Sequence, residues 1–184
     1  MDSLSAGPAP SHHREQTMDV VPLALYVDAV ERASSTGYCL PDAALAQVRT
    51  ALRGAAPVFA ALTAELDGGS PARANGHLVV YTEDLVAYVN FTRMPARGPL
   101  PEDDDEALGV FTIEVAARAA LSALSLLYAT APARAYPQDG AGLSGNARLV
   151  LTYVGFGNEV VIPTGGAVRH DVDALYARLL DDLR

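Results

Sequence analysis

Two hairpin-like patterns constrain the fold of this sequence more than any other feature. Residues 77–81 and 85–91 are rich in β-branched and aromatic residues, and a short acidic turn, residues 82–84, separates them. Such residues fit a pleated, half-buried surface, and two such runs around a short polar turn are typical of a β-hairpin. Residues 147–154 and 159–162 repeat the arrangement around a glycine-containing turn. The sequence therefore predicts two hairpins.

Five further segments carry apolar residues at the three- and four-residue spacing of an amphipathic helix. The first two begin with proline, which suits a first helical turn, and the last begins with Asp171, a good capping residue. The sequence predicts helices over residues 22–33, 41–52, 57–66, 116–128 and 171–183.

The stretch before the fourth helix, residues 107–115, fits two structures. Phe111, Ile113 and Val115 alternate with their neighbours as in a strand, yet the same residues can form the first turns of a longer helix. From Ala116 onward the leucines recur at helical spacing, and a helix is predicted there.

These elements predict an α+β fold. We expect an antiparallel sheet built from the two hairpins, with helices packed on one face, in the order helix–hairpin–helix–hairpin–helix. Residues 18–184 are enough for a single domain with its own core. Residues 1–17 contain proline, glycine, serine and charge without periodicity, and are expected to form a disordered N-terminal arm.

In element order, roughly residues 42–183 resemble two known families. One is the class I type III secretion chaperones, which are acidic homodimers that hold an effector segment. The other is the roadblock and longin-like modules, which dimerise and regulate GTPases. Either resemblance implies a homodimer whose ligand is another protein.

Charge excludes two classes of partner. The formal net charge is −9, with thirteen basic residues against twenty-two acidic ones. Nucleic-acid binding needs a basic surface to displace counterions, and anionic membranes repel an acidic one. No apolar run approaches the length of a membrane span, so no membrane insertion is expected. The single cysteine, Cys39, lies in an apolar setting and suits an inert thiol in a reducing cytoplasm.

Candidate catalytic and metal sites each have a simpler explanation. Ser144 misses the nucleophile-elbow spacing by one residue, so a triad with His170 and Asp139 is less favoured than a glycine–serine loop. His77, His170, Asp171 and Asp173 are potential metal ligands, but aspartates at the start of a helix are usually caps. The acidic pairs at 83–84 and 102–106 sit in a turn and a loop. No catalytic residue, metal or cofactor is predicted.

Tyrosines on the two hairpins are the candidate interface residues. Tyr81, Tyr88 and Tyr153 combine an apolar ring with a polar tip, which suits a protein interface, although ordinary sheet packing explains them equally well. We therefore expect a non-catalytic protein-binding domain, adaptor or chaperone-like, and homodimeric. The alternative is a small-molecule-binding domain or an enzyme with a scattered site.

Overall fold

The structure is a computed structural model that describes residues 20–68, 73–98, 109–128, 147–165 and 169–184. The expected N-terminal arm, residues 1–17, lies outside these ranges. Within them the chain forms three α-helices, one short 3-10 turn and seven strands. The strands make two antiparallel sheets rather than one.

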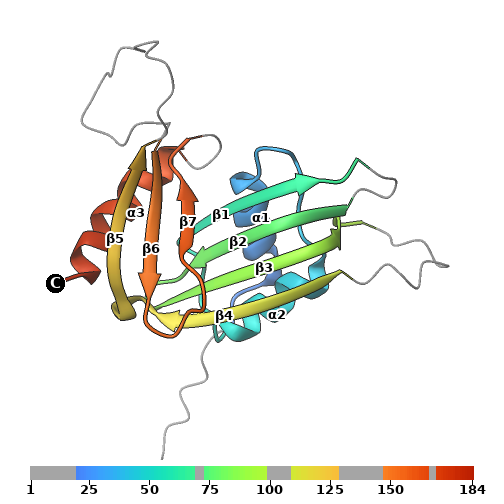
Figure 1. Cartoon of the computed structure of the whole chain (residues 1–184). Helices are drawn as coiled ribbons and strands as arrows, with labels where there is room; N and C mark the ends of the chain where they lie inside the picture. The colour runs from blue at the N-terminus through green and yellow to red at the C-terminus, as the bar shows by residue number, and fades with distance from the viewer. Residues whose placement is uncertain (1–19, 69–72, 99–108, 129–146, 166–168) are drawn as a thin grey trace, which may run out of the picture.

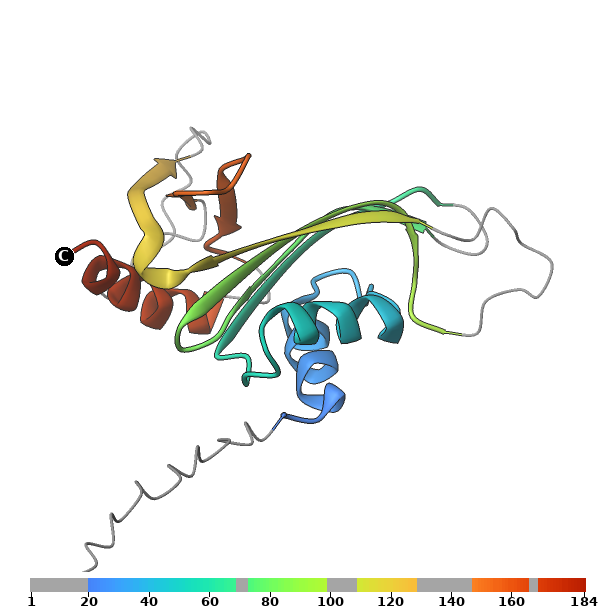
Figure 2. The same ribbon diagram turned by 90° about the horizontal axis from the view of Figure 1, so that it is seen from below.

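Four strands form the first sheet, in the order in which they follow along the chain. They are β1 (Phe59–Leu66), β2 (Arg73–Tyr81), β3 (Leu85–Pro95) and β4 (Val110–Ala117). Two helices lie beneath one face of this long, curved sheet (Figure 1 and Figure 2). Helix α1 (Leu23–Ala33) contacts β1, and helix α2 (Asp42–Ala51) contacts β3 and β4.

The face of the first sheet that the two helices cover is apolar, and its apolar residues form successive rows that run across the strands. Two of these, called here the apolar rows, are made of paired residues from all four strands: Leu62, Leu78, Val89 and Ile113, and next to them Ala60, Val80, Ala87 and Val115. Tyr38, between the two helices, stacks on Phe91 of the same face with ring centroids 5.8 Å apart. This layer forms the main hydrophobic core.

The second sheet has three strands, β5 (Leu121–Tyr128), β6 (Ala147–Tyr153) and β7 (Val160–Pro163), with β6 in the middle. It stands at one end of the first sheet, on the side away from α1 and α2 (Figure 2). Helix α3 (Arg169–Asp182) packs against β5 and buries Val172, Leu175 and Leu179. The core therefore continues from the first sheet into the second.

A corner at η1 (Arg118–Ala120) joins β4 to β5. The Arg118 side chain is largely buried there. Its Nη2 and Nε donate to Asp182 Oδ2 at 2.8 and 3.1 Å, and its Nη1 donates to the Glu83 carbonyl at 3.0 Å. Its backbone N–H donates to the Asp84 carbonyl at 2.8 Å. One residue thus joins the corner, the end of α3 and the turn between β2 and β3.

The α+β class and both hairpins are confirmed. The first hairpin is β2–β3 and the second is β6–β7, each antiparallel. The predicted helices at 22–33, 41–52 and 171–183 correspond to α1, α2 and α3. The open question at residues 107–115 is answered for residues 110–115, which belong to strand β4, whereas residues 107 and 108 lie outside the described residues.

The predicted element order is wrong. Both N-terminal helices precede all the described strands, and among the described residues no α-helix lies between the hairpins, so helix–hairpin–helix–hairpin–helix does not describe the order found. The resemblance in element order to secretion chaperones and roadblock modules loses its basis with it. Residues 59–66 of the predicted helix over 57–66 form strand β1 instead, because each of them pairs with a residue of β2 at the edge of the first sheet.

The predicted helix over residues 116–128 is also wrong, and a β-bulge explains why. The register with β6 shifts between Leu121 and Ala123, and this places Leu121, Leu124 and Leu126 on one face of the strand. The three-residue step from Leu121 to Leu124 therefore imitates helical spacing. Local helix propensity is a weak prior, and pairing with the distant strand β6 overrides it.

We predict that α3 is an integral part of the core. Leu179 is fully buried, whereas Leu183, one turn on, is 39% exposed. Leu179→Ala should lower the free energy of unfolding by about 2–5 kcal/mol, because it removes buried methyl groups and leaves a cavity. Leu183→Ala is the matched control and should cost much less. Denaturant unfolding measures both, and equal effects would show that α3 packs loosely.

We further predict that the pair formed by Arg118 and Asp182 stabilises the corner. Asp182→Asn should lower the free energy of unfolding by about 2–4 kcal/mol, because it leaves the Arg118 guanidinium desolvated without a counter-charge. Asp181→Asn is the control, since Asp181 pairs with Arg184 where both side chains are exposed, at 72% and 81%. That change should cost about 0.5 kcal/mol or less. Equal effects of the two changes would contradict the prediction.

Candidate functional site

The three candidate interface tyrosines lie in the interior of the folded protein. Tyr81, Tyr88 and Tyr153 are all buried, where the second sheet meets the open face of the first. The hydroxyl oxygens of Tyr81 and Tyr153 lie 3.1 Å apart. Burial raises the pKa of Tyr153 to about 12 and that of Tyr81 well above its usual range, so both stay protonated and one can donate to the other. A role at a protein interface stays a prediction, and it would require the sheets to separate.

Phe156, which the sequence did not single out, completes this aromatic cluster. It sits in the turn between β6 and β7 and lies 6.3 Å from Tyr88 and 5.2 Å from Tyr153, measured between ring centroids. The rings of this cluster pack together at the junction of the two sheets. The sequence did not indicate this packing role because Phe156 lies in a glycine-rich turn, and such turns are usually exposed to solvent.

The catalytic and metal candidates do not assemble into a site. Ser144, Asp139 and residues 102–106 lie outside the described residues. His170 is the second residue of α3, but its side chain is not described, and Asp171 occupies the first helical turn. Among the described residues, no three His, Cys, Asp or Glu side chains are grouped to hold a metal ion. Cys39 is buried, and burial raises the pKa of its thiol to about 11.

Strand β4 is where the apolar core reaches solvent. In both apolar rows the residues of β2 and β3 are fully buried, but at β4 Ile113 is only half-buried and Val115 is 40% exposed. At the opposite edge, in β1, the rows end in the buried residues Leu62 and Ala60. The core of the first sheet is therefore closed at β1 and open at β4.

The backbone of β4 is open as well. Among the described strands it pairs with β3 alone. It is eight residues long and contains neither proline nor lysine, which commonly block pairing at a sheet edge. Its one charged side chain, Glu114, accepts a hydrogen bond from the Gly157 backbone N–H at 2.8 Å. A further strand can therefore pair with β4 without meeting an unpaired charge.

Strand β5 continues this edge beyond the corner. In the described sheet it pairs with β6 alone, and Leu127 and Tyr128 near its end are more than half exposed. Strand β7, at the other edge of the second sheet, has four residues and ends in Pro163, which limits pairing there. We name β4 and β5 together the open edge.

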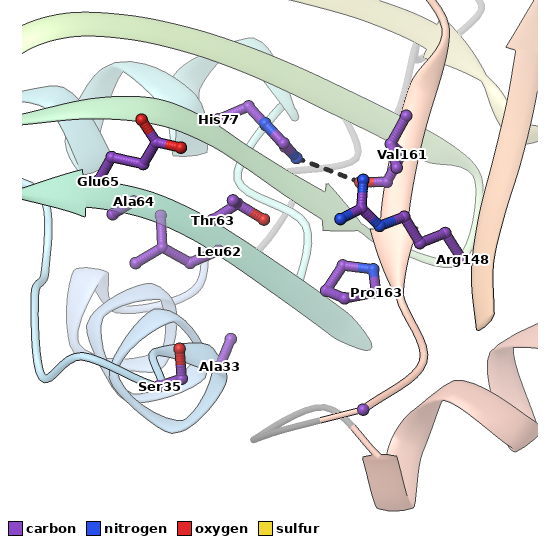
Figure 3. Close-up of a pocket in the computed structure, with 11 residues that line it drawn as sticks. Ala33, Ser35, Leu62, Thr63, Ala64, Glu65, His77, Arg148, Val161 and Pro163 are labelled. Atoms are coloured by element: carbon purple, nitrogen blue, oxygen red, sulfur yellow. Dashed lines mark hydrogen bonds between the residues drawn. The ribbon is translucent and has the colours of Figure 1, made fainter. Parts of the chain in front are cut away.

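A second feature is a crevice where the edge of β1 approaches β7 (Figure 3). It has a volume of about 390 Å³, and its lining includes Glu65 from β1, His77 from β2 and Arg148 from β6. His77 Nε2 donates to the Val161 carbonyl of β7 at 3.1 Å, which joins the two sheets. The carbonyl requires the proton to be on Nε2.

Comparison of the chain with family models, with curated proteins and with solved structures finds no match. In the described part of the chain, none of the helices has the length and apolar character needed to cross a membrane. The open edge and the crevice are therefore the features from which function is inferred.

We predict that His77 makes stability depend on pH. Burial lowers its pKa below the ordinary value of 6.5, so the unfolded chain takes up a proton before the folded one does. The contribution of neutral His77 to the free energy of unfolding is present above about pH 6.5, and it is lost as the pH falls from there through the folded-state pKa. His77→Gln keeps a donor for the Val161 carbonyl but cannot titrate in this range.

Unfolding of both proteins at about pH 8 and about pH 5.5 tests this. The wild type should lose more stability than His77→Gln over that interval. Equal losses would show that His77 titrates alike in the folded and unfolded chains.

Proposed function

We propose that this chain is a non-catalytic protein-binding domain, of adaptor or chaperone-like type, that forms a homodimer through its open edge. The observation that supports this most directly is the exposure of the apolar rows at β4, where Ile113 and Val115 end a core that is buried everywhere else along those rows. A strand added beside β4 would cover both residues and satisfy the free backbone groups of the edge.

A second copy is the partner that fits β4 best. Antiparallel pairing of β4 with its own copy is compatible with twofold symmetry, the commonest symmetry of oligomers. Such pairing would extend the four-stranded sheet into one of eight strands, with the helices of both copies on the same face.

The distribution of charge supports self-association at this edge. The chain carries a net charge of −9, so most of its surface repels a second copy. Residues 110–128 contain two charged side chains, Glu114 and Arg118, of opposite sign, and both are held by internal hydrogen bonds. The open edge is therefore close to neutral, and repulsion is weakest there.

The proposal includes a cytoplasmic location. It is supported by the single cysteine, which is kept as a buried thiol and needs no oxidising compartment. An acidic surface also makes a basic or neutral polypeptide a better second partner than nucleic acid.

Light scattering on the purified protein tests the dimer. The mass should be twice the 19.2 kDa of one chain at micromolar concentration. Val110→Lys puts a charge on the edge strand β4 and should weaken the dimer by about tenfold or more, because a lysine on an edge strand opposes pairing with a further strand.

The matched control is Val154→Lys. Val110 and Val154 are each 70% exposed, but Val154 lies in the turn after β6 and belongs to neither strand of the open edge. The control should remain a dimer with unchanged affinity. A wild-type mass of one chain, or equal effects of the two lysines, would overturn the proposed edge.

A further inference from the structure

The crevice between β1 and β7 has the dimensions of a ligand site. Its volume of about 390 Å³ falls within the range of small-molecule pockets. Its lining includes four residues with apolar side chains, Leu62, Ala64, Val161 and Pro163. Two opposite charges, on Glu65 and Arg148, stand on either side of it (Figure 3).

Arg148 is a cation available to a ligand. Arg97, Arg118, Arg178 and Arg184 each form an ion pair with a carboxylate. Arg148 is exposed, and in the described part of the chain its side chain takes part in no ion pair or hydrogen bond. In a chain of net charge −9, a guanidinium that no described carboxylate pairs with is a local attraction for an anion. Its planar fork matches a carboxylate in particular.

Glu65 is the complementary group. It is exposed on the outer half of β1, and among the described residues it too forms no ion pair, either with Arg148 or with another arginine. Two opposite charges that face one crevice and do not neutralise each other suit a ligand that carries both charges, one at each end.

We propose that this crevice binds a short peptide with free ends, with its carboxylate on Arg148 and its ammonium group directed to Glu65. The aliphatic side chains between them would contact the middle of the peptide. Thr63 and Ser35, which also line the crevice, offer hydroxyl groups to its backbone. The edge of β1 lies alongside and can pair with an extended segment.

His77 sets the width of this site. Its hydrogen bond to the Val161 carbonyl fixes β2 to β7, and its ring lies 5.7 Å from that of Tyr88, which holds it from the other side. The ring is neutral at neutral pH, since burial lowers its pKa. It therefore adds no charge, and Glu65 and Arg148 alone decide the polarity of the bound ligand.

Titration of the full-length protein with trialanine, followed by calorimetry or by amide chemical shifts, tests the proposal. Binding should be saturable, and Arg148→Gln should weaken it by about tenfold, the usual effect of losing a hydrogen bond between charged groups. Glu65→Gln should weaken it by a smaller factor, because an ammonium group offers no bidentate contact. Arg184→Gln, which changes an exposed arginine just beyond the end of α3, is the control and should leave affinity unchanged.

Modified probes assign each end of the ligand. Trialanine amide lacks the terminal carboxylate and should bind the wild type about as weakly as trialanine binds Arg148→Gln, with no further loss in that variant. N-acetyl-trialanine should behave in the same way with Glu65→Gln. No saturable binding of trialanine, or equal affinity of trialanine and its amide, would overturn the proposal.

The outcome of the peptide titration does not depend on whether the chain forms a dimer. The same titration with Val110→Lys should give the wild-type affinity, because the crevice lies at β1 and β7 and not at the open edge. Peptide binding without dimerisation, or dimerisation without peptide binding, would each refute one proposal and leave the other standing.

Discussion

The buried guanidinium of Arg118 is the interaction on which the arrangement of the two sheets depends. A guanidinium taken out of water needs acceptors for its donors and a charge to balance it. Asp182 supplies the charge from the end of α3, and the Glu83 carbonyl supplies an acceptor from the turn between β2 and β3. Three segments far apart in sequence are thereby brought to one point, and the chain turns from β4 into β5 there.

The orientation of the second sheet follows from this corner, and it explains the buried tyrosines, the crevice and the open edge. This sheet covers one end of the open face of the first sheet and buries Tyr81, Tyr88 and Tyr153 in the junction. The other end of that face stays polar and accessible, and its border with β7 forms the crevice. The corner also leaves β4 and β5 as the terminal strands of their sheets, so the open edge and the crevice both result from one change of direction.

The two proposed binding sites depend on different kinds of interaction. At the open edge, unpaired backbone groups and apolar side chains require cover, and the near absence of charge permits a second acidic copy to approach. At the crevice, two separated opposite charges select a ligand with charges at both ends. A domain that dimerises at one edge and holds a peptide at another would act as an adaptor, whereas peptide binding alone would favour the small-molecule-binding alternative.

Elements whose partners are local could be predicted from the sequence. Hairpins β2–β3 and β6–β7 were predicted because each strand pairs with its neighbour in the chain, and α1, α2 and α3 because their apolar spacing repeats over several turns. The α+β class and the burial of Cys39 follow from the same local patterns. The net charge, which any arrangement of these residues must carry, is the basis for the prediction that nucleic acid is not a partner.

Only the tertiary structure decided the elements whose partners are distant. Residues 59–66 and 121–128 are strands because β2 and β6 pair with them, and no local pattern separates such strands from short helices. The division into two sheets depends on where Arg118 finds its acceptors. The crevice joins side chains from β1, β2 and β6, and the interface tyrosines turned inward because the second sheet covers them. Spacing along a chain records which residues share a face, but which face is buried depends on what packs against it.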